Sequence, residues 1–212
     1  MEKQYVTSLL LASASPRRRE LIKRLGVKVN FTSVDCDESV ASGENYKTYV
    51  SRMSKEKLEA AVLSLEQQKL TLPHSTLVIA CDTIVVYGFE ILLKPKNIFE
   101  ARIMLKKLSG SEHEVFTSVS WKIPNGKPTT QVKSFLTKTK VHFYKISSGL
   151  LEKYLNSKQW QDKAGSYGIQ DPIASLFVKK IKGNYENVIG LPVARLNREI
   201  GEHISTNVRT NI

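Results

Sequence analysis

The sequence is poor in cysteine, histidine and long apolar runs, and each shortage excludes a class of protein. Two cysteines among 212 residues cannot build the disulfide framework of a small secreted domain, and four scattered histidines match no zinc-site spacing. No stretch approaches the roughly 18 apolar residues that a membrane-spanning helix needs, and the apolar run at residues 6–12 is too short for a secretory signal. We therefore expect a cytoplasmic protein with no membrane partner.

Glycine-rich phosphate loops are also absent. The sequence contains no GxxxxGK[ST] and no GxGxxG after a strand pattern, which argues against a P-loop NTPase, a kinase and a dinucleotide enzyme. It contains no repeat, low-complexity block or linker rich in proline, glycine or serine, so no domain boundary is forced. Hydrophobic and charged contents of 41% and 25% are typical of a globular fold.

Periodicity predicts both helices and strands. The strongest strand signal is the nearly continuous apolar run at residues 77–87. Helical spacing predicts further elements at residues 45–68 and 98–108, and strand patterns occupy residues 115–123, 132–144 and 174–181. An α/β fold is therefore expected.

Positive charge is in excess over the whole chain. The sequence has 32 Lys and Arg residues against 20 Asp and Glu residues, a net charge of +12. Such a surplus favours an anionic partner, whether a nucleotide, a nucleic acid or an acidic membrane.

Three adjacent arginines, residues 17–19, stand where a helix least favours cations. Ser15 is a natural N-cap and Pro16 suits the first helical position, so the arginines fall in the first turn. The helix macrodipole is positive at that end and attracts anions. The pattern predicts phosphate binding; the alternative is that the arginines reach solvent or pair with Glu20 and Glu38.

Two lysines also stand in unusual places. Lys57 lies on the apolar stripe of the helix predicted at residues 45–68, so it either snorkels to water or reaches into a cleft to meet negative charge. Lys94 precedes Pro95, which favours an extended backbone. It is either a phosphate contact or an ordinary surface lysine.

Carboxylates form the complementary set. Asp82 interrupts the apolar strand at residues 77–87, where an unpaired carboxylate must neutralise, find a cation or emerge at the strand end. It is therefore the best catalytic candidate. Asp35, Asp37 and Glu38 follow a strand predicted at residues 27–34, and they either ligate a divalent cation or form an ordinary acidic turn.

A polar loop at residues 160–172 completes the inventory. Its glycines allow the backbone to approach a ligand, and the Gln170 amide suits paired hydrogen bonds with a base edge. Cations for a polyphosphate, carboxylates for a metal and one carboxylate to take a proton from water are the parts that phosphoryl chemistry needs.

Six segments resemble the successive motifs of the Maf family, the septum-formation-inhibitor-like nucleoside triphosphate pyrophosphatases. They occur in the family's order and extend from about residue 9 to residue 200. The segments are LASASPRRRELI at 11–22, ACDT at 80–83, LKP at 93–95, LSGSEHEVFT at 108–117, DKAGSYGIQ at 162–170 and GNYENVIGLP at 183–192.

The resemblance implies a fold and a reaction. The fold is α/β, an elongated, mixed, curved β-sheet flanked by helices with a cleft between two lobes, similar to the inosine triphosphate pyrophosphatase fold. One domain of two lobes would cover residues 1–204, followed by a frayed tail at 205–212. The reaction is hydrolysis of a nucleoside triphosphate to the monophosphate and pyrophosphate, with Mg²⁺ or Mn²⁺, and members are often homodimers.

The resemblance also assigns roles to residues. Asp82 matches the family's proton acceptor and, with Asp37 and Glu38, falls near its metal. The substrate-binding positions are Ser15, Arg17, Arg18, Lys57 and Lys94. The specificity positions are Arg17, Thr83 and Gln170. This combination looks like the branch acting on dTTP and UTP, because the branch acting on 7-methyl-GTP carries an aromatic residue in place of Arg17 and an acid in place of Gln170.

Two residues depart from the family's pattern and bear on base preference. Asp171 stands where glycine is usual, and Cys81 stands where a small residue is usual. The rival enzyme hypothesis is a 7-methyl-GTP or broad noncanonical-nucleotide pyrophosphatase, and a non-catalytic family member is a further alternative. A nucleic-acid-binding module is the rival of another class; scattered basic residues and the lack of an aromatic platform or helix-turn-helix pattern speak against it.

Overall fold

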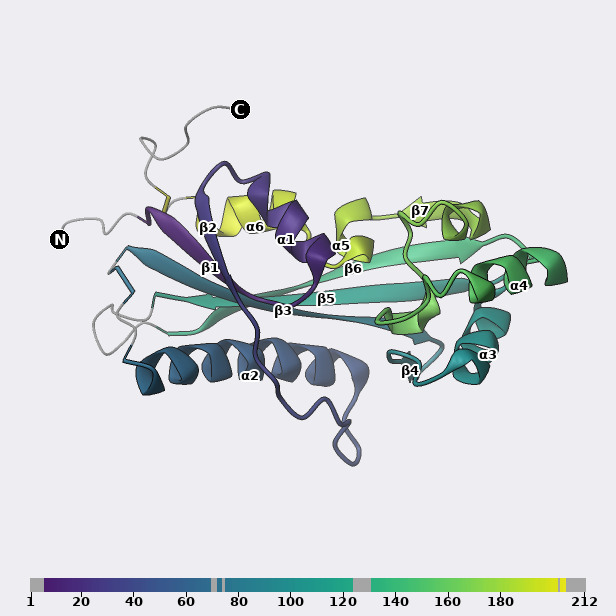
Figure 1. The fold of residues 1–212 in the computed structure, drawn as a ribbon, viewed down its shortest axis with the longest axis horizontal. Coiled ribbons are helices and arrows are strands. Elements are labelled where there is room, and N and C mark those ends of the chain that lie inside the picture. Colours follow the sequence, from purple (N-terminus) through teal and green to yellow (C-terminus); the bar gives the residue numbers. More distant parts are fainter. Residues whose placement is uncertain (1–5, 70–71, 74, 124–130, 202, 205–212) are drawn as a thin grey trace. The chain divides into compact units, whose positions relative to one another are not determined.

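The computed structural model describes residues 6–69, 72–73, 75–123, 131–201 and 203–204. The tail expected at residues 205–212 lies outside the described residues. Figure 1 shows a sheet with helices packed around it. No helix among the described residues is long and apolar enough to cross a membrane.

The strands of the described residues belong to one mixed sheet. Its order is β2-β1-β3-β5-β6-β7, with β4 paired to β3. The strands are β1 (Ser8–Ala12), β2 (Lys28–Thr32), β3 (Thr76–Tyr87), β4 (Glu90–Leu92), β5 (Glu112–Lys122), β6 (Lys133–Phe143) and β7 (Val178–Lys182). β1 pairs in parallel with β2 and β3, whereas β4 and β7 run antiparallel to β3 and β6. The prediction of an α/β fold with a mixed sheet is confirmed.

Helices connect several of the strands, and two helices of the described residues follow the last strand. The helices are α1 (Pro16–Lys23), α2 (Tyr46–Gln67), α3 (Ile98–Leu108), α4 (Ser148–Asn156), α5 (Tyr185–Ile189) and α6 (Val193–Ile200), with 3₁₀ helices η1 (Ala164–Ser166) and η2 (Ala174–Phe177). The helices predicted at 45–68 and 98–108 are confirmed. The strand predicted at 174–181 is wrong in its first half, because the backbone there turns as η2, with Ser175 N donating to Asp171 O.

The chain divides into two compact units. Unit 1 comprises Met1–Asp82, Ser118–Leu136 and Gly190–Ile212, and unit 2 comprises Thr83–Thr117 and Thr137–Ile189. The division falls inside β3, so Asp82 and Thr83 belong to different units. That residues 1–204 form one domain of two lobes stays a prediction.

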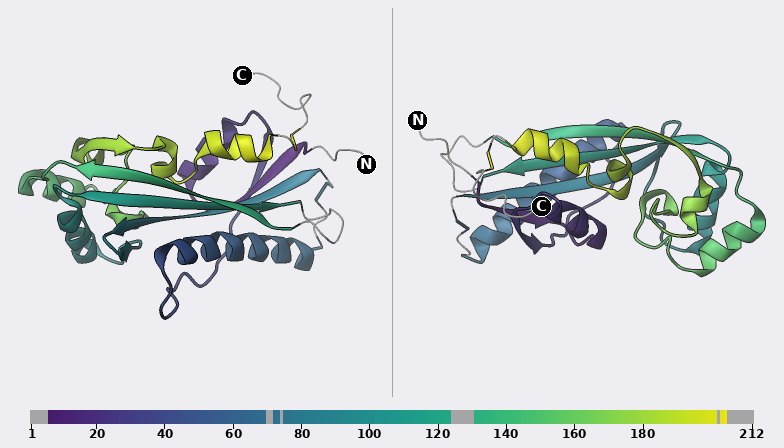
Figure 2. Two further views of the ribbon diagram at one scale, coloured as in Figure 1. Left: turned by 180° about the vertical axis from the view of Figure 1, so that it is seen from behind. Right: turned by 90° about the horizontal axis from the view of Figure 1, so that it is seen from above.

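In unit 1, helices cover both faces of the sheet. α2 lies on one face of β1 and β3, and α1 and α6 lie on the other, as the views in Figures 1 and 2 agree. Leu58, Ala61 and Val62 of α2 pack against the strand residues Leu10, Ala12, Val78 and Ala80. Because side chains alternate along a strand, Asp82 shares the α2-facing side of β3 with Val78 and Ala80.

In unit 2, helices α3 and α4 and the loop after α4 enclose a core rich in aromatic rings. Phe143 contacts the rings of His113, Tyr167 and Phe177 edge-on, and Tyr154 contacts Phe177 in the same way. All these residues are buried. The C-terminal part of the 160–172 loop is therefore anchored by its own aromatic residue, Tyr167.

Gly165 is held where a side chain has no room. Its φ is +65°, and an added Cβ would lie 2.9 Å from both Cγ atoms of Val85. We expect Gly165→Ala to lower the free energy of unfolding by about 2–4 kcal/mol, through the left-handed backbone and the clash together. Denaturant unfolding measures the change. Gly149→Ala in α4, where an added Cβ meets nothing within 4 Å, is the control and should be neutral or slightly stabilising. Equal stability of Gly165→Ala and the parent protein would contradict the packing described here.

His113 gives unit 2 a predictable sensitivity to acid. It is 2% exposed, its Nε2 lies 2.8 Å from the Tyr167 hydroxyl oxygen, and its Nδ1 is buried without a hydrogen-bond partner. Burial lowers the pKa of His113 to about 3, although the Glu112 carboxylate opposes the shift. His113 therefore stays neutral in the folded protein at neutral pH, which agrees with a structural role.

A lowered folded-state pKa means that the unfolded chain takes up the proton first. The stability that His113 contributes is present above about pH 6.5, its unfolded pKa, and is lost as pH falls toward 3. Between pH 6 and 4 the free energy of unfolding should fall more steeply for the parent protein than for His113→Phe, by about 1.4 kcal/mol per pH unit. Urea unfolding across this range tests the slope, with His142→Gln as control. Parallel slopes for the parent protein and His113→Phe would refute the prediction.

Candidate active site

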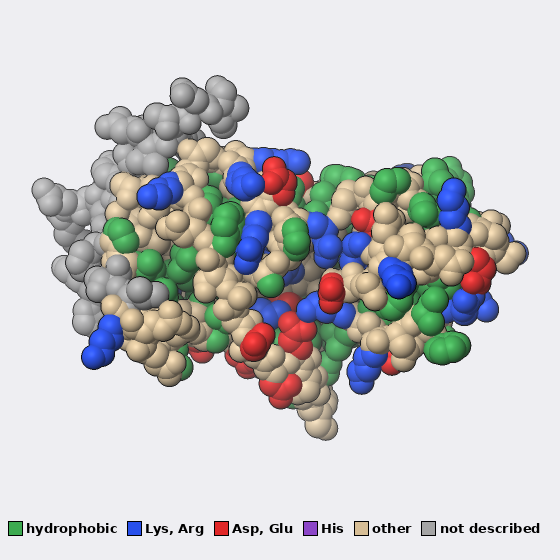
Figure 3. All heavy atoms as spheres, viewed as in Figure 1, with side chains coloured by type: hydrophobic (Ala, Val, Ile, Leu, Met, Phe, Trp, Pro, Cys, Tyr) green, Lys and Arg blue, Asp and Glu red, His purple; other side chains and the backbone are tan. Residues whose placement is uncertain are grey.

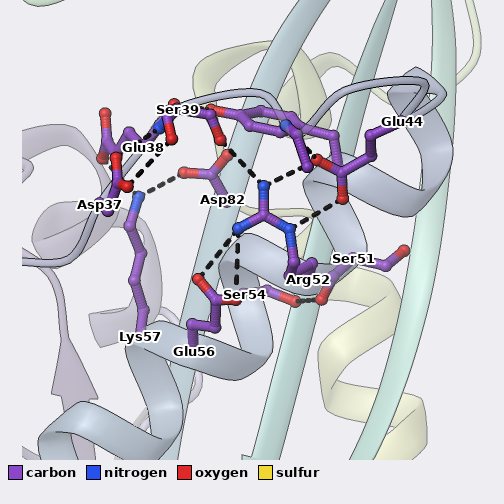
Figure 4. A network of polar contacts seen from close by, with 12 residues as sticks. Asp37, Glu38, Ser39, Glu44, Ser51, Arg52, Ser54, Glu56, Lys57 and Asp82 are labelled. Carbon is purple, nitrogen blue, oxygen red and sulfur yellow. Dashed lines mark hydrogen bonds and ion pairs between the residues drawn. The ribbon is translucent and has the colours of Figure 1, made fainter.

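Lys57 is the centre of the candidate site. It lies on the buried face of α2 and is 9% exposed. Its Nζ donates to Glu38 Oε1 at 2.7 Å and to Asp82 Oδ1 at 2.5 Å (Figure 4). Of the two interpretations of this lysine, contact with negative charge is confirmed and snorkelling to water is wrong.

The carboxylates around Lys57 offset the effect of burial on its ammonium. Burial lowers the pKa of Lys57, but the charge and hydrogen bond of Asp82 and the hydrogen bond of Glu38 outweigh it, so the pKa lies above its ordinary value. Lys57 is therefore an ammonium at neutral pH. Asp82, 9% exposed in β3, has the cation that a carboxylate in a buried strand was expected to need.

The loop that carries Glu38 is fastened to α2. The Tyr49 hydroxyl donates to Glu38 O at 2.8 Å. The Arg52 guanidinium donates to both carboxylate oxygens of Glu44, at 2.8 and 2.7 Å, and to Ser39 O at 2.9 Å. Arg52 thus holds the loop at two points that follow its acidic turn, and Figure 4 shows the guanidinium enclosed by these groups.

Sequence reasoning did not find Arg52. The available signal was its spacing from Glu56, four residues later, which is the spacing of ion pairs on a helix. Arg52 Nη1 does donate to both oxygens of Glu56, at 3.2 and 3.1 Å. The bidentate bond to Glu44 lies outside the helix and could not be read from that spacing.

The expected metal ligands are only partly brought together. Glu38 and Asp82 share the Lys57 ammonium, whereas the Asp37 carboxylate accepts from Ser39 N at 2.9 Å and Ser39 Oγ at 3.0 Å. These hydrogen bonds lower the pKa of Asp37. Among the described residues, no group of three His, Cys, Asp or Glu side chains is placed to hold a metal. A metal role for Asp37, Glu38 and Asp82 stays a prediction.

The start of α1 forms as the sequence predicts. Ser15 is the N-cap, its hydroxyl accepts from Arg18 N at 3.5 Å, and Pro16 is the first helical residue. Arg17 therefore lies in the first turn, where it is half-buried. Phosphate binding by Ser15, Arg17 and Arg18 stays a prediction.

The next two arginines bind backbone carbonyls of unit 1. Arg18 donates to Cys81 O and to Gly190 O, both at 3.0 Å. Arg19 donates to Ser13 O at 2.9 Å. The alternative, that the arginines reach solvent or pair with Glu20 and Glu38, stays a prediction. Arg18 ties α1 to the peptide that precedes Asp82.

Three further expected residues belong to unit 2. Thr83 Oγ1 lies 2.9 Å from Thr117 Oγ1, which donates to Asn187 O at 3.0 Å. Lys94 follows β4 and is exposed, and Gln170 is exposed in the turn after η1. Their roles in binding and specificity stay predictions.

Removal of the Lys57 ammonium should destabilise unit 1. Lys57→Met leaves Glu38 and the nearly buried Asp82 without their shared cation, and we expect a loss of about 3 kcal/mol at pH 7. Because the pKa of Lys57 is raised on folding, its contribution is full below about pH 10.4, the unfolded pKa, and declines as pH rises further. The gap between the two proteins in urea unfolding should therefore narrow above pH 10.

Lys140→Met is the matched control for this comparison. Lys140 pairs with Glu112 at 2.9 Å on the surface, where both side chains are more than a third exposed, so its removal should change stability little. Equal effects of the two substitutions would contradict the central place given to Lys57.

Several known proteins are similar to this chain over most of its length. Residues 8–203 match the family model described as Maf-like protein. A protein from Pseudoalteromonas atlantica named dTTP/UTP pyrophosphatase is 40% identical over 190 residues, which cover 90% of this chain and 94% of that protein. One of the same name from Agathobacter rectalis is 39% identical over 199 residues, with 92% and 97% covered. A crystal structure titled nucleoside-triphosphatase / dITP/XTP pyrophosphatase, from Mycobacterium abscessus, aligns with a TM-score of 0.45 at 12% identity, covering 92% of this chain and 93% of that chain. The family match and the two sequence relatives extend over nearly the whole chain, which therefore belongs to the Maf family.

Proposed function

We propose that this Maf-family protein is a nucleoside triphosphate pyrophosphatase that hydrolyses dTTP and UTP to the monophosphate and pyrophosphate. One observation carries the proposal. Lys57 holds Asp82 and Glu38 at a single ammonium, in a chain about 40% identical to proteins named dTTP/UTP pyrophosphatase.

Asp82 takes the role of proton acceptor. Lys57 fixes the carboxylate through Oδ1, and Arg18 braces the preceding peptide through Cys81 O. A carboxylate held in this way can take a proton from a water that attacks the α-phosphorus in line. The electron pair of the broken bond leaves with pyrophosphate.

Basic groups are proposed to bind the triphosphate, and carboxylates are proposed to bind the metal ion. Ser15, Arg17, Arg18, Lys57 and Lys94 are the groups proposed to bind its oxygens. The Glu38 and Asp82 carboxylates are hard oxygen donors that already surround a cation, the Lys57 ammonium, so they suit Mg²⁺ or Mn²⁺. Together with Asp37 they would hold the ion, which when bound neutralises phosphate charge.

Base choice is assigned to Arg17, Thr83 and Gln170. The exposed Gln170 amide has both a donor and an acceptor. Thymine and uracil present the matching pair, an N3–H beside the O4 carbonyl. The names of the relatives favour dTTP and UTP over 7-methyl-GTP as substrates.

On one face of the protein (Figure 3), basic, acidic and apolar side chains lie together, which does not favour a nucleic acid there. On the face shown in Figure 3, Lys and Arg side chains are interspersed with acidic and apolar ones. A duplex or single strand needs a continuous basic stripe or patch along its backbone.

A panel of nucleotides tests the function. With Mg²⁺ or Mn²⁺, pyrophosphate release should be fastest from dTTP and UTP among dTTP, UTP, CTP, 7-methyl-GTP, ITP, GTP and ATP. Asp82→Asn should lower kcat by about 10²-fold or more, because the proton acceptor is lost, while calorimetry still detects nucleotide binding.

Product identity and a surface control make the panel decisive. Pyrophosphate and monophosphate must appear together; inorganic phosphate and a diphosphate would indicate a different bond. Glu112→Gln removes a surface carboxylate that pairs with Lys140 and should leave turnover intact. Near-normal turnover of Asp82→Asn would remove Asp82 from its role, and no hydrolysis of any nucleotide would overturn the proposed function.

A further inference from the structure

Asp171 is tied down by two groups of unit 2. Its Oδ2 lies 2.9 Å from Lys163 Nζ and accepts a hydrogen bond from the Tyr154 hydroxyl at 3.1 Å. The side chains of Lys163 and Asp171 are only 10% and 12% exposed. Lys163 Nζ also donates to Gln159 O. This ion pair is therefore close to fully enclosed, unlike the exposed pairs of this unit.

The same carboxylate packs against the turn that presents Gln170. Asp171 N donates to Gly168 O at 2.9 Å, which closes a turn over residues 168–171. A Cβ added to Gly168 would lie 2.6 Å from Asp171 Oδ2 and 2.8 Å from Lys163 Cε. Glycine at 168 thus leaves the space that the ion pair fills.

Gln170 is the part of this turn that faces outward. Ile169 is 3% exposed, whereas Gln170 is exposed. The buried neighbour on one side and the anchored carboxylate on the other fix the backbone from which the Gln170 amide projects. Rotation of the turn would have to break a nearly buried ion pair.

From these contacts we infer that Asp171, held by Lys163 and Tyr154, is a positioning residue that aims the Gln170 amide and thereby sets base selectivity. The inference rests on the proposed function. Uracil and cytosine share shape and differ at the edge that an amide can read: uracil offers N3–H and a carbonyl, cytosine a bare N3 and an amino group. A turn held in one place presents the Gln170 amide to the base at one distance and angle, whereas a turn free to shift lets the amide accommodate either pattern.

The ratio of kcat/KM for UTP to that for CTP measures whether the Gln170 amide is oriented for uracil. Asp171→Asn keeps the shape but removes the charge, and we expect the ratio to fall about fivefold or more, the range of one paired base contact. The change should fall on KM more than on kcat, as for a loss of binding. Tyr154→Phe removes the hydrogen bond to Asp171 Oδ2 and should lower the ratio in the same direction by a smaller factor. This second variant keeps the test valid if Asp171→Asn does not fold.

A double-mutant cycle separates aiming from general structural support. If Asp171 acts through Gln170, then Asp171→Asn made on a Gln170→Ala background should not lower the ratio further. Lys140→Met, which breaks an exposed ion pair of the same unit, should leave the ratio unchanged. An unchanged ratio in both Asp171→Asn and Tyr154→Phe would overturn the inference, as would full additivity with Gln170→Ala.

The outcomes distinguish failure of this inference from failure of the proposed function. A parent protein that hydrolyses neither UTP nor dTTP overturns the proposed function and the inference together. A parent protein that prefers UTP to CTP, with variants that keep the preference, overturns the inference alone.

Discussion

The ion pairs of Lys57 are the constraint on which the candidate site depends. A carboxylate that is 9% exposed within a strand is costly unless a cation meets it, and Asp82 meets the Lys57 ammonium at 2.5 Å. The same nitrogen binds Glu38. Strand β3, helix α2 and the loop after β2 are therefore fastened at one atom, although Glu38 and Asp82 lie 19 and 25 positions from Lys57. The Lys57 ammonium and the Asp82 carboxylate make each other's burial tolerable, and the partly exposed Glu38 carboxylate is a second negative partner.

Such a cluster needs support beyond its own charges, because a loop carboxylate could leave the lysine for water. Arg52 and Tyr49 lie on the same helix as Lys57 and bind the backbone of Ser39 and Glu38, and Arg52 also grips Glu44. One helix thus supplies both the central cation and the anchors of the loop that approaches it. On the opposite face of the sheet, Arg18 binds Cys81 O, the carbonyl directly before Asp82. The catalytic candidate is braced from α1 and from α2.

What the sequence predicts well in this chain is local. The cap at Ser15, the start of α1 at Pro16, the buried strand β3 and the misplaced lysine on α2 all follow from propensity and periodicity. The demand that Asp82 find a cation could also be predicted, because burial alone imposes it. The identity of that cation could not be predicted, because Lys57 lies 25 positions from Asp82 and only the packing of α2 on the sheet brings the two together. The clamp of Arg52 on Glu44 was missed for the same reason. At residues 174–177 the predicted strand failed because a hydrogen bond from Ser175 N to Asp171 O turns the backbone into η2.

Asp171, beside the residue proposed to contact the base, shows what could not be predicted from the sequence. In the sequence it is only a departure from a pattern; in the structure its carboxylate joins Lys163 and Tyr154 behind the turn that carries Gln170. These bonds stay within unit 2, and those of Lys57 to Glu38 and Asp82 stay within unit 1. The contacts that hold Asp82 and those that hold the turn of Gln170 thus involve different residues. Residues without shared partners contribute to free energy nearly additively. If Asp171 aims Gln170 as proposed, a substitution at residue 171 changes base preference without disturbing the ion pairs that hold Asp82.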